Sequence, residues 1–445
     1  MQPSRQDPPA VPPTETVAAN LSQPLLERPG VRPAGVRQVF RDLALPYVSN
    51  GVIGLIFSAS GPIAVTLAVG AAGGLTEAQL ASWVFGILFS GGAATLVMSL
   101  LYRQPLGFAW SIPGTVLLGP SLQHLSFPEV VGAFFTSGML VLALGATGVV
   151  RRIMSVIPMP IVMSMVAAVF LKFGTDIVAS TQANPVVAAP MVVAFLVLTA
   201  VPALGRFLPP VLGTLVVGCV AVAASGQFAF HGGGPILATP VFTVPEFTWA
   251  AQLELVVPLA LTVLFVQNGQ GIAVLRAAGH NPPVNVFAIV SGAFSLLNAG
   301  CGAVSACVTG PTNALMTSSG TRQRQYTAAV VFGVLALGCA LLAPALTRLM
   351  LATPTEFILA LGGIAMLRAL QQAFVTAFAT TFTLGSLVTF VVTMSGMSLF
   401  NIHPAFWGLV IGFAVSRVLE HSDHAGPNTR LKSSTPAPHL EASAN

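Results

Sequence analysis

Charged side chains occupy only 7% of the 445 positions in this chain, whereas 54% are apolar and the formal net charge is +5. Soluble proteins are about a quarter charged, so these residues cannot cover a water-soluble surface. With a mean hydropathy of +0.84, the composition predicts an all-α polytopic membrane protein embedded in a lipid bilayer. The few basic residues are scattered singly between apolar runs, so we expect no nucleic-acid partner.

The two ends of the chain differ from the rest. Residues 1–40 are rich in Pro, Gln, Glu and Arg and contain no apolar run of the kind found in a signal peptide. We expect this arm to be disordered and cytoplasmic, and we expect the same of the tail at 421–445.

Twelve apolar stretches are predicted to cross the bilayer as helices, since a crossing takes about 20 residues. In the first half these stretches run near 47–70, 78–101, 129–150, 157–173, 186–204 and 209–224. In the second half they run near 251–273, 283–298, 325–347, 354–370, 377–396 and 402–419. Two further segments, 104–120 and 302–318, are apolar but interrupted by Gly and Pro. The sequence therefore predicts about fourteen crossings.

The distribution of arginine supports this number and gives an orientation. Cytoplasmic loops of membrane proteins carry an excess of Lys and Arg. When the basic N-terminal arm is placed in the cytoplasm, most other loop arginines fall on the same side: Arg103, Arg151, Arg152, Arg206, Arg276, Arg322, Arg324 and Arg417. Only Arg348 departs from this pattern among the loops. We therefore expect a multi-pass protein of the plasma membrane (a bacterial inner membrane) with both termini in the cytoplasm.

The two halves of the chain resemble each other in the order of their features. The correspondences are FSASGPIAV (57–65) with FVQNGQGIAV (265–274), WSIPGTVLL (110–118) with CVTGPTNALM (307–316), and Pro158 and Lys172 with Pro354 and Arg368. The last two pairs share one offset of 196 positions (354 − 158 = 368 − 172). Each half holds seven crossings, an odd number, so the second copy must enter the membrane from the opposite side. This predicts an inverted-topology repeat, typical of secondary transporters, with copies at 41–225 and 226–420.

The interrupted segments are the expected binding region. In QPLGFAWSIPGTVLLG, Pro113 suits the first turn of a helix, so residues 105–111 are predicted to be extended, with Ser111 or Ile112 near the helix cap. The second segment, AVSACVTGPTNALM, repeats this design. Irregular backbone at membrane depth is tolerated only when it is buried in protein or lines a cavity. The alternative is a pair of proline kinks that serve packing alone.

Two half-helices that enter from opposite sides would point their N-termini at a shared point near the midplane. Each N-terminus offers unpaired N–H groups and the positive end of a helix dipole, which together favour an anion. The sequence therefore predicts a site for an anion or a strongly polar group, and its candidate residues are Trp110, Ser111, Pro113, Gly114, Thr115, Thr309, Gly310, Thr312 and Asn313.

Three amides interrupt the span near 251–273, namely Gln267, Asn268 and Gln270. Buried amides need hydrogen-bond partners, which are either a substrate or a neighbouring helix. We predict that these amides line the substrate site. Ser58 and Ser60 occupy the matching place in the first span and are candidates for the same reason.

Acidic residues are absent from the centres of the predicted spans. Glu254 and Glu356 lie near outer ends and are expected to be interfacial, and His403 is expected to cap or to lie at the surface. Lys172 and Arg368 lie near predicted helix ends, where snorkelling to the head groups is the simplest expectation and a gating role is the alternative. A coupled proton would then travel on the substrate's own carboxyl group, whose pKa rises on desolvation.

Sequence signatures of soluble catalysis are not found. The chain has no GxxxxGK[ST], HExxH or CxxC pattern and no glycine-rich dinucleotide fingerprint in a strand–helix context. We expect neither catalytic residues nor a metal or cofactor, and transport would then be secondary. The four cysteines lie in apolar segments, where packing is the commoner role: Cys219, Cys301, Cys307 and Cys339.

Three stretches carry a resemblance to a known family: YRQPLGFAWSIPGTVLL (102–118), QNGQGIAVLRAAGHNPPV (267–284) and HPAFWGLVIG (403–412). They resemble the hallmark sequences of benzoate membrane transporters, the BenE-type benzoate/proton symporters, which are related to nucleobase permeases and sulfate-type anion carriers. The resemblance implies a fold of seven plus seven helices. Helices one to four and eight to eleven would form a core domain, and the others would form a gate domain.

The same resemblance implies a function. It implies a benzoate-like anion held between the third and tenth helices, proton symport, and an elevator-like movement of the core against the gate. A homodimer through the gate is an analogy with the family. The tenth segment departs from the family pattern in carrying Pro311 with Thr309, Thr312 and Asn313, and Gln270 stands where the family often has Pro.

Two other functions are compatible with the sequence. One is a permease for a nucleobase or an inorganic anion with the same fold. Nucleobase sites in related permeases usually present carboxylates, whereas the central positions here are amides and hydroxyls. The other is a non-transporting membrane scaffold, which has no need of two broken helices in register.

Overall fold

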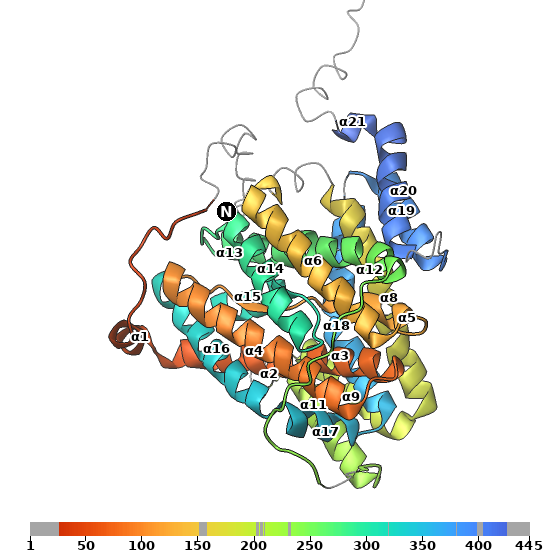
Figure 1. The fold of residues 1–445 in the computed structure, drawn as a ribbon. Coiled ribbons are helices and arrows are strands. Elements are labelled where there is room, and N and C mark those ends of the chain that lie inside the picture. The colour runs from red at the N-terminus through yellow and green to blue at the C-terminus, as the bar shows by residue number, and fades with distance from the viewer. Residues whose placement is uncertain are drawn as a thin grey trace, which may run out of the picture.

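The computed structural model describes residues 26–150, 158–201, 204, 208, 210–229, 233–318, 320–379, 381–397 and 404–424, and these form a bundle of helices (Figure 1). Several features predicted from sequence lie outside these residues. They are the arm before residue 26, the tail from 425, and the loop positions Arg151, Arg152, Arg206 and His403.

The first half begins with the short helix α1 (Val36–Asp42) and continues with α2 (Leu45–Ala59), α3 (Gly61–Ala72), α4 (Glu77–Tyr102), β1 (Phe108–Trp110), α5 (Ile112–Ser121), α6 (Phe127–Thr147), α8 (Met159–Ala183), α9 (Pro185–Ala200) and α11 (Pro210–Ala224). The second half comprises α12 (Trp249–Leu261), the π-helical turn η1 (Thr262–Gln267), α13 (Asn268–Ala277), α14 (Val284–Gly300), β2 (Ala306–Val308), α15 (Gly310–Thr317), η2 (Arg322–Arg324), α16 (Tyr326–Leu341), α17 (Ala343–Leu351), α18 (Thr355–Phe378), α19 (Thr383–Met394), α20 (Pro404–Leu419) and α21 (His421–His424).

The described part of the chain contains the predicted number of crossings. Seven helical stretches are long and apolar enough to span a membrane, and five shorter helices are apolar. The two strand–helix units, β1–α5 and β2–α15, complete a set of fourteen, with seven in each half. The predicted all-α fold with two broken helices is therefore confirmed.

The packing of the helices shows the inverted repeat directly. The second crossing of the first half, α4, packs on α16, which is the fourth crossing of the second half. Reciprocally, α6 is the fourth crossing of its half and packs on α14, the second crossing of the other. Helices α8 and α18, which are the fifth crossings, pack on each other. Such exchanged pairing is what a two-fold relation between the halves requires.

The strands β1 and β2 meet at the centre of the fold as an antiparallel pair, with Ala109 opposite Cys307. Each strand is supported by a hydroxyl from the second crossing of its own half. Thr95 of α4 accepts from the Phe108 amide at 2.8 Å, and Ser295 of α14 accepts from the Ala306 amide at 3.0 Å. Backbone N–H groups buried at membrane depth need such partners. The extended stretch predicted before Pro113 is therefore present and is satisfied from both sides.

The described part of the N-terminal arm is attached to the bundle. The Glu27 carboxylate accepts from the amides of Asn285 and Val286 at 3.1 and 3.2 Å, at the start of α14. The Tyr102 hydroxyl, at the end of α4, donates to the Glu27 carbonyl at 2.5 Å. The prediction of a disordered arm is therefore wrong for residues 26–40, because these contacts and α1 fix them against the ends of α4 and α14.

Two helices are longer than predicted. Helix α8 continues to Ala183 and α18 to Phe378, beyond the ends expected near residues 173 and 370. Lys172 and Arg368 are therefore the central residues of their helices, and the prediction that they lie near helix ends is wrong. The polar residues that follow them lie on the same helices.

Candidate functional site

A cavity of about 570 Å³ lies beside the crossing of the two broken segments. One wall comes from α2, β1–α5, α13 and β2–α15, and the opposite wall comes from α8, α9, α11 and α18. Ligand sites commonly fall between about 300 and 1,000 Å³, and a pocket of about 150 Å³ can hold benzene. The cavity is therefore large enough for a small organic molecule.

Eight of the fourteen predicted site residues line this cavity: Ser58, Trp110, Pro113, Gln267, Gln270, Thr309, Gly310 and Thr312. The structure thus brings together residues that are separated by up to 254 positions in the chain, as in the approach of Ser58 Oγ to Thr312 Oγ1 at 3.5 Å. The other six predicted residues lie outside the lining, and their side chains or backbone serve the crossing itself.

The N-terminus of α15 is open toward the cavity. Thr309 is the residue before the helix, but its side chain makes no capping hydrogen bond. Within the described residues, no hydrogen bond reaches the amides of Gly310 or Thr312. Unpaired amides at a helix start favour a negatively charged group. This end of α15 therefore attracts an anion to the cavity.

Two buried polar side chains at the same place also lack a protein partner. Trp110 Nε1 and Thr309 Oγ1 have no hydrogen-bond partner among the described residues, and their side chains are only 2% and 5% exposed. A buried donor without a partner costs about 1–3 kcal/mol. Both residues line the cavity, so a bound anion would relieve this cost by accepting from the indole N–H and the hydroxyl.

The N-terminus of α5, in contrast, is closed. Ser111 is its cap, not Ile112, and the Ser111 hydroxyl accepts from the Gly114 amide at 3.1 Å and donates to Thr262 Oγ1 at 3.0 Å. Thr115 donates its hydroxyl to the Ser111 carbonyl at 3.0 Å. Ser111, Gly114 and Thr115 therefore stabilise the helix start. They were predicted to be site residues, but none of them lines the cavity.

Two asparagines predicted to bind substrate hold the strands instead. Asn313 accepts from the Gly107 amide and donates to the Gly107 carbonyl, both at 2.9 Å, and so joins α15 to the start of β1. Asn268 accepts from the Val308 amide at 2.8 Å and so joins α13 to β2. Because their amides are occupied by backbone, the expectation that they contact substrate is not met by the geometry. The Ser60 hydroxyl likewise bonds to backbone, because it donates to the Phe57 carbonyl at 3.0 Å.

The other two amides remain at the cavity. Gln267 is 4% exposed and lines the cavity, and its side chain makes no hydrogen bond within the described part of the chain. Gln270 packs against the start of α15, because a Cβ added to Gly310 would lie 3.1 Å from the Gln270 Cβ. The Gln270 side chain thus lies close against this glycine, and a larger residue at 310 would require it to shift by a few tenths of an ångström.

Most of the remaining lining is apolar and was missed by the sequence reasoning. It includes Phe57, Pro62, Ile112, Met159, Met163, Phe170, Phe195, Val211, Val266, Ile364, Ala365 and Met366. Such residues have no distinguishing signal in a sequence that is apolar throughout. Together they form a surface suited to an aromatic ring.

Arg368 is the one charged side chain among the lining residues, and no Asp or Glu lines the cavity. Its guanidinium donates to Gln371 Oε1 at 3.3 Å on its own helix. No group of three potential metal-ligating side chains occurs in the described ranges. The electrostatic balance of the cavity therefore favours an anion.

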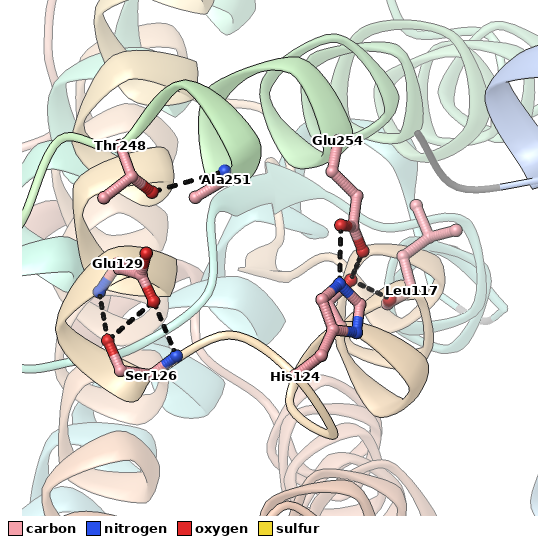
Figure 2. A network of polar contacts seen from close by, with 8 residues as sticks. Leu117, His124, Ser126, Glu129, Thr248, Ala251 and Glu254 are labelled. Atoms are coloured by element: carbon pink, nitrogen blue, oxygen red, sulfur yellow. Dashed lines mark hydrogen bonds and ion pairs between the residues drawn. The ribbon is translucent and has the colours of Figure 1, made fainter. Parts of the chain in front are cut away.

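A second polar cluster lies at the far end of α5, where Figure 2 shows Glu254 of α12 facing His124. The Glu254 carboxylate is joined to His124 Nε2 at 2.9 Å and accepts from the Ser121 hydroxyl. Glu254 is 2% exposed, so its carboxylate is buried within the protein, and its position near the outer end of the span stays a prediction. With the contact between Ser111 and Thr262, this cluster ties α5 to the α12–η1 segment at both ends.

The inverted repeat, the fourteen crossings and a cavity at two broken helices define a multi-pass membrane transporter. A family model described as "Benzoate membrane transport protein" (BenE) matches residues 41–418. The chain belongs to this BenE family, as its resemblance in sequence predicted.

Relatives and solved structures agree with this assignment. The chain is 30% identical to the inner membrane protein YdcO of Escherichia coli (strain K12), over 82% of this chain and 94% of YdcO. It is 26% identical to the benzoate membrane transport protein of Acinetobacter baylyi (strain ATCC 33305 / BD413 / ADP1), over 85% and 96% of the two chains.

The fold is also found in anion transporters of distant sequence. The transmembrane domain of the cyanobacterium bicarbonate transporter BicA matches with a TM-score of 0.56 at 13% identity, over 86% of this chain and 99% of that one. The structure of SLC26A9 matches with a TM-score of 0.56 at 12% identity, over 86% and 67%. At these identities the likeness concerns the fold alone.

Proposed function

We propose that the protein is a secondary active transporter of a small aromatic carboxylate resembling benzoate. The observation that carries this proposal is the polarity of the cavity. One end presents the open start of α15 with two unpartnered donors, Trp110 Nε1 and Thr309 Oγ1, and the rest is apolar. A carboxylate on a flat apolar ring has the same two-part character.

The proposed pose follows from these groups. The carboxylate accepts from the amides of Gly310 and Thr312, from the Thr309 hydroxyl and from the Trp110 indole. Hydrogen bonds to a charged group contribute about 1.5–3 kcal/mol each, more than neutral ones. The ring lies against the methionines and phenylalanines of α2 and α8. Ser58, Pro113, Gln267 and Gln270 complete the lining on the side of the broken helices.

An elevator-type movement is consistent with how the walls of the cavity are divided. One wall comes from α2, β1–α5, α13 and β2–α15, which pack with the helix pairs α4–α16 and α6–α14. The other wall comes from α8, α9, α11 and α18. Contact between the two groups includes the start of α3, where a Cβ on Gly61 would lie only 2.0 Å from the Ala365 Cβ of α18. We propose that the first group is the mobile core and that the second is the gate, through which a homodimer forms.

We further propose that protons accompany the substrate on its own carboxyl group. No acidic side chain lines the cavity, so the described residues offer no carboxylate there to carry the proton. Transfer of the anion into the apolar cavity disfavours its charged form and raises the pKa of the substrate. Transport of the acid form would be electrically neutral.

An uptake panel in proteoliposomes tests the proposal. We expect saturable uptake of radiolabelled benzoate, competition by substituted benzoates, and alkalinisation of the external medium on adding benzoate. Uracil and sulfate serve as matched probes for a nucleobase or inorganic-anion permease. If uracil or sulfate is taken up and benzoate is not, the protein is a permease for a nucleobase or an inorganic anion instead. If none of the three is taken up, a non-transporting scaffold is favoured. Benzoate uptake without proton movement would reject the proton step alone.

A further inference from the structure

The middle of α18 carries a polar stripe that continues from the cavity. Arg368, Gln372 and Thr376 are spaced four residues apart, so they lie on one face of the helix, and all three line the cavity. Gln372 Nε2 donates to Thr376 Oγ1 at 3.3 Å. The cavity therefore extends along α18 toward its C-terminal end, which is the predicted cytoplasmic side.

Helix α8 carries the corresponding stripe. The two halves are related by an offset of 196 positions. By this offset, Lys172, Asp176 and Ser180 of α8 correspond to Arg368, Gln372 and Thr376 of α18. The contact between the helices confirms this offset, because a Cβ added to Gly174 would meet Leu370, its own counterpart, at 3.1 Å. Phe170 and its counterpart Met366 both line the cavity. The pseudo-two-fold axis thus passes beside the cavity, and the two polar stripes run from it in opposite directions.

The charges on these stripes are too deep for the head groups. Lys172 and Arg368 are each about 15–20 Å from either end of their helices at 1.5 Å per residue, farther than their side chains extend. A charge at this depth is stable only in a water-filled space or beside a partner. Arg368 has the cavity, whereas Lys172 is paired with Asp176, with Nζ and Oδ1 3.0 Å apart.

The α8 stripe is closed at two of its three residues in this structure, Asp176 and Ser180, whereas the Lys172 side chain at its start is 76% exposed. Asp176 is 9% exposed and Ser180 is 3% exposed, and the Ser180 hydroxyl has no hydrogen-bond partner among the described residues. None of its three residues lines the cavity. Inverted repeats exchange their conformations when a carrier turns from one face of the membrane to the other. The α8 stripe then takes the arrangement that the α18 stripe has here.

We propose that the two stripes are the access paths for the substrate anion on the two faces of the membrane, Arg368–Gln372–Thr376 on one face and Lys172–Asp176–Ser180 on the other. This inference rests on the proposed transport of a carboxylate. The paths are electrically unequal, because Asp176 neutralises Lys172 whereas Arg368 has no carboxylate partner in the described part of the chain. Arg368 therefore attracts the anion more strongly from its own face.

Sided transport kinetics test the assignment. In vesicles of each orientation, we expect Arg368→Gln to raise the KM for benzoate about tenfold from the Arg368 face and less than twofold from the other, as for loss of a steering charge. Arg368→Lys should restore the KM. Asp176→Asn should lower the KM from the opposite face only, because it releases Lys172. At 1 M salt, where the screening length is about 3 Å, these differences should shrink. Equal shifts from both faces, or none in an active protein, would overturn the proposal.

Cysteine labelling gives a readout that does not depend on the substrate. In a variant lacking the four native cysteines, Thr376→Cys should react with a membrane-impermeant thiol reagent from one face, and Ser180→Cys only from the other. Labelling of both from the same face, or none at Ser180→Cys, would refute the two paths. If labelling follows the expected sides but the unmodified protein carries no benzoate, the proposed substrate fails and the paths stand.

Discussion

The two broken segments have the same topology but different chemistry at their helix starts. In β1–α5, the Ser111 hydroxyl accepts a hydrogen bond from the Gly114 amide. Hydrogen bonds from Ser111 to Thr262 and from Ser121 to Glu254 hold the two ends of α5 against α12–η1. In β2–α15, Thr309 caps nothing, and its hydroxyl has no partner among the described residues. One half-helix is therefore fastened to its neighbours, whereas the other keeps its donors available at the cavity.

This difference teaches that an inverted repeat need not yield a symmetric site. Two helix starts converge, as the proline patterns predict, but only one of them retains its attraction for an anion. The closed half-helix provides the rigid surface against which the open one is positioned. Substitutions at Asn313, Thr309, Trp110 and Ser111 separate the structural role of the closed start from the binding role of the open one.

Asn313→Ala should have the largest effect because it separates the two units. It leaves the buried N–H of Gly107 without its partner, which costs about 1–3 kcal/mol, and it removes one of the two hydrogen bonds to the Gly107 carbonyl, which keeps the Thr309 amide as a donor. We expect a clear fall in the Tm of the purified protein and loss of uptake. Asn281→Ala, at an exposed loop position, is the control. An unchanged Tm would show that Asn313 does not hold the crossing.

Thr309→Val should weaken binding with little change in stability. Valine keeps the shape of threonine but removes the unpartnered hydroxyl of this cavity-lining residue. Loss of a hydrogen bond to a charged group costs about 1.5–3 kcal/mol, so the KM for benzoate should rise roughly 10- to 100-fold. A KM within twofold of the original, at normal expression, would remove Thr309 from the site.

Trp110→Phe tests the second unpartnered donor. Phenylalanine keeps an aromatic surface and removes the indole N–H, so we expect the KM to rise about 5- to 10-fold while the Tm changes little. Benzamide, which lacks the negative charge, should be bound less tightly by the unmodified protein and should lose less affinity in the variant. Equal losses for both ligands would mean that the indole serves packing rather than anion binding.

Ser111→Ala should have the smallest effect on transport and is the matched counterpart of Thr309→Val. Loss of an N-terminal cap costs about 0.5–2 kcal/mol, so the Tm should fall. Because Ser111 lies outside the cavity lining, the KM should stay within about twofold of its original value. A large rise in KM with an unchanged Tm would reverse the assignment of the closed and open helix starts.

The sequence was sufficient for the features that depend on local pattern. Apolar length and loop arginines predict the crossings, Pro113 and Pro311 predict the half-helices, and the offset of 196 predicts the repeat. The roles of individual polar residues depend on partners far along the chain. Asn313, for example, bonds to Gly107 across 206 positions, and no local signal distinguishes it from Thr312 beside it.

The same limit explains the errors at charged residues. The partners of Glu254 could not be predicted, because Ser121 and His124 come to it from α5 and the loop that follows. Lys172 and Arg368 were interpreted as marks of helix ends, since only the packed structure supplies Asp176 and the cavity as their surroundings. The apolar lining was indistinguishable from any other apolar face.

A structure with bound benzoate would locate the carboxylate relative to the two helix starts. We expect both oxygens to lie within hydrogen-bond distance of the Gly310 and Thr312 amides, the Thr309 hydroxyl and the indole of Trp110, with the ring against α8. A carboxylate seated at the start of α5, or paired with Arg368 with the ring near the helix starts, would contradict this expectation.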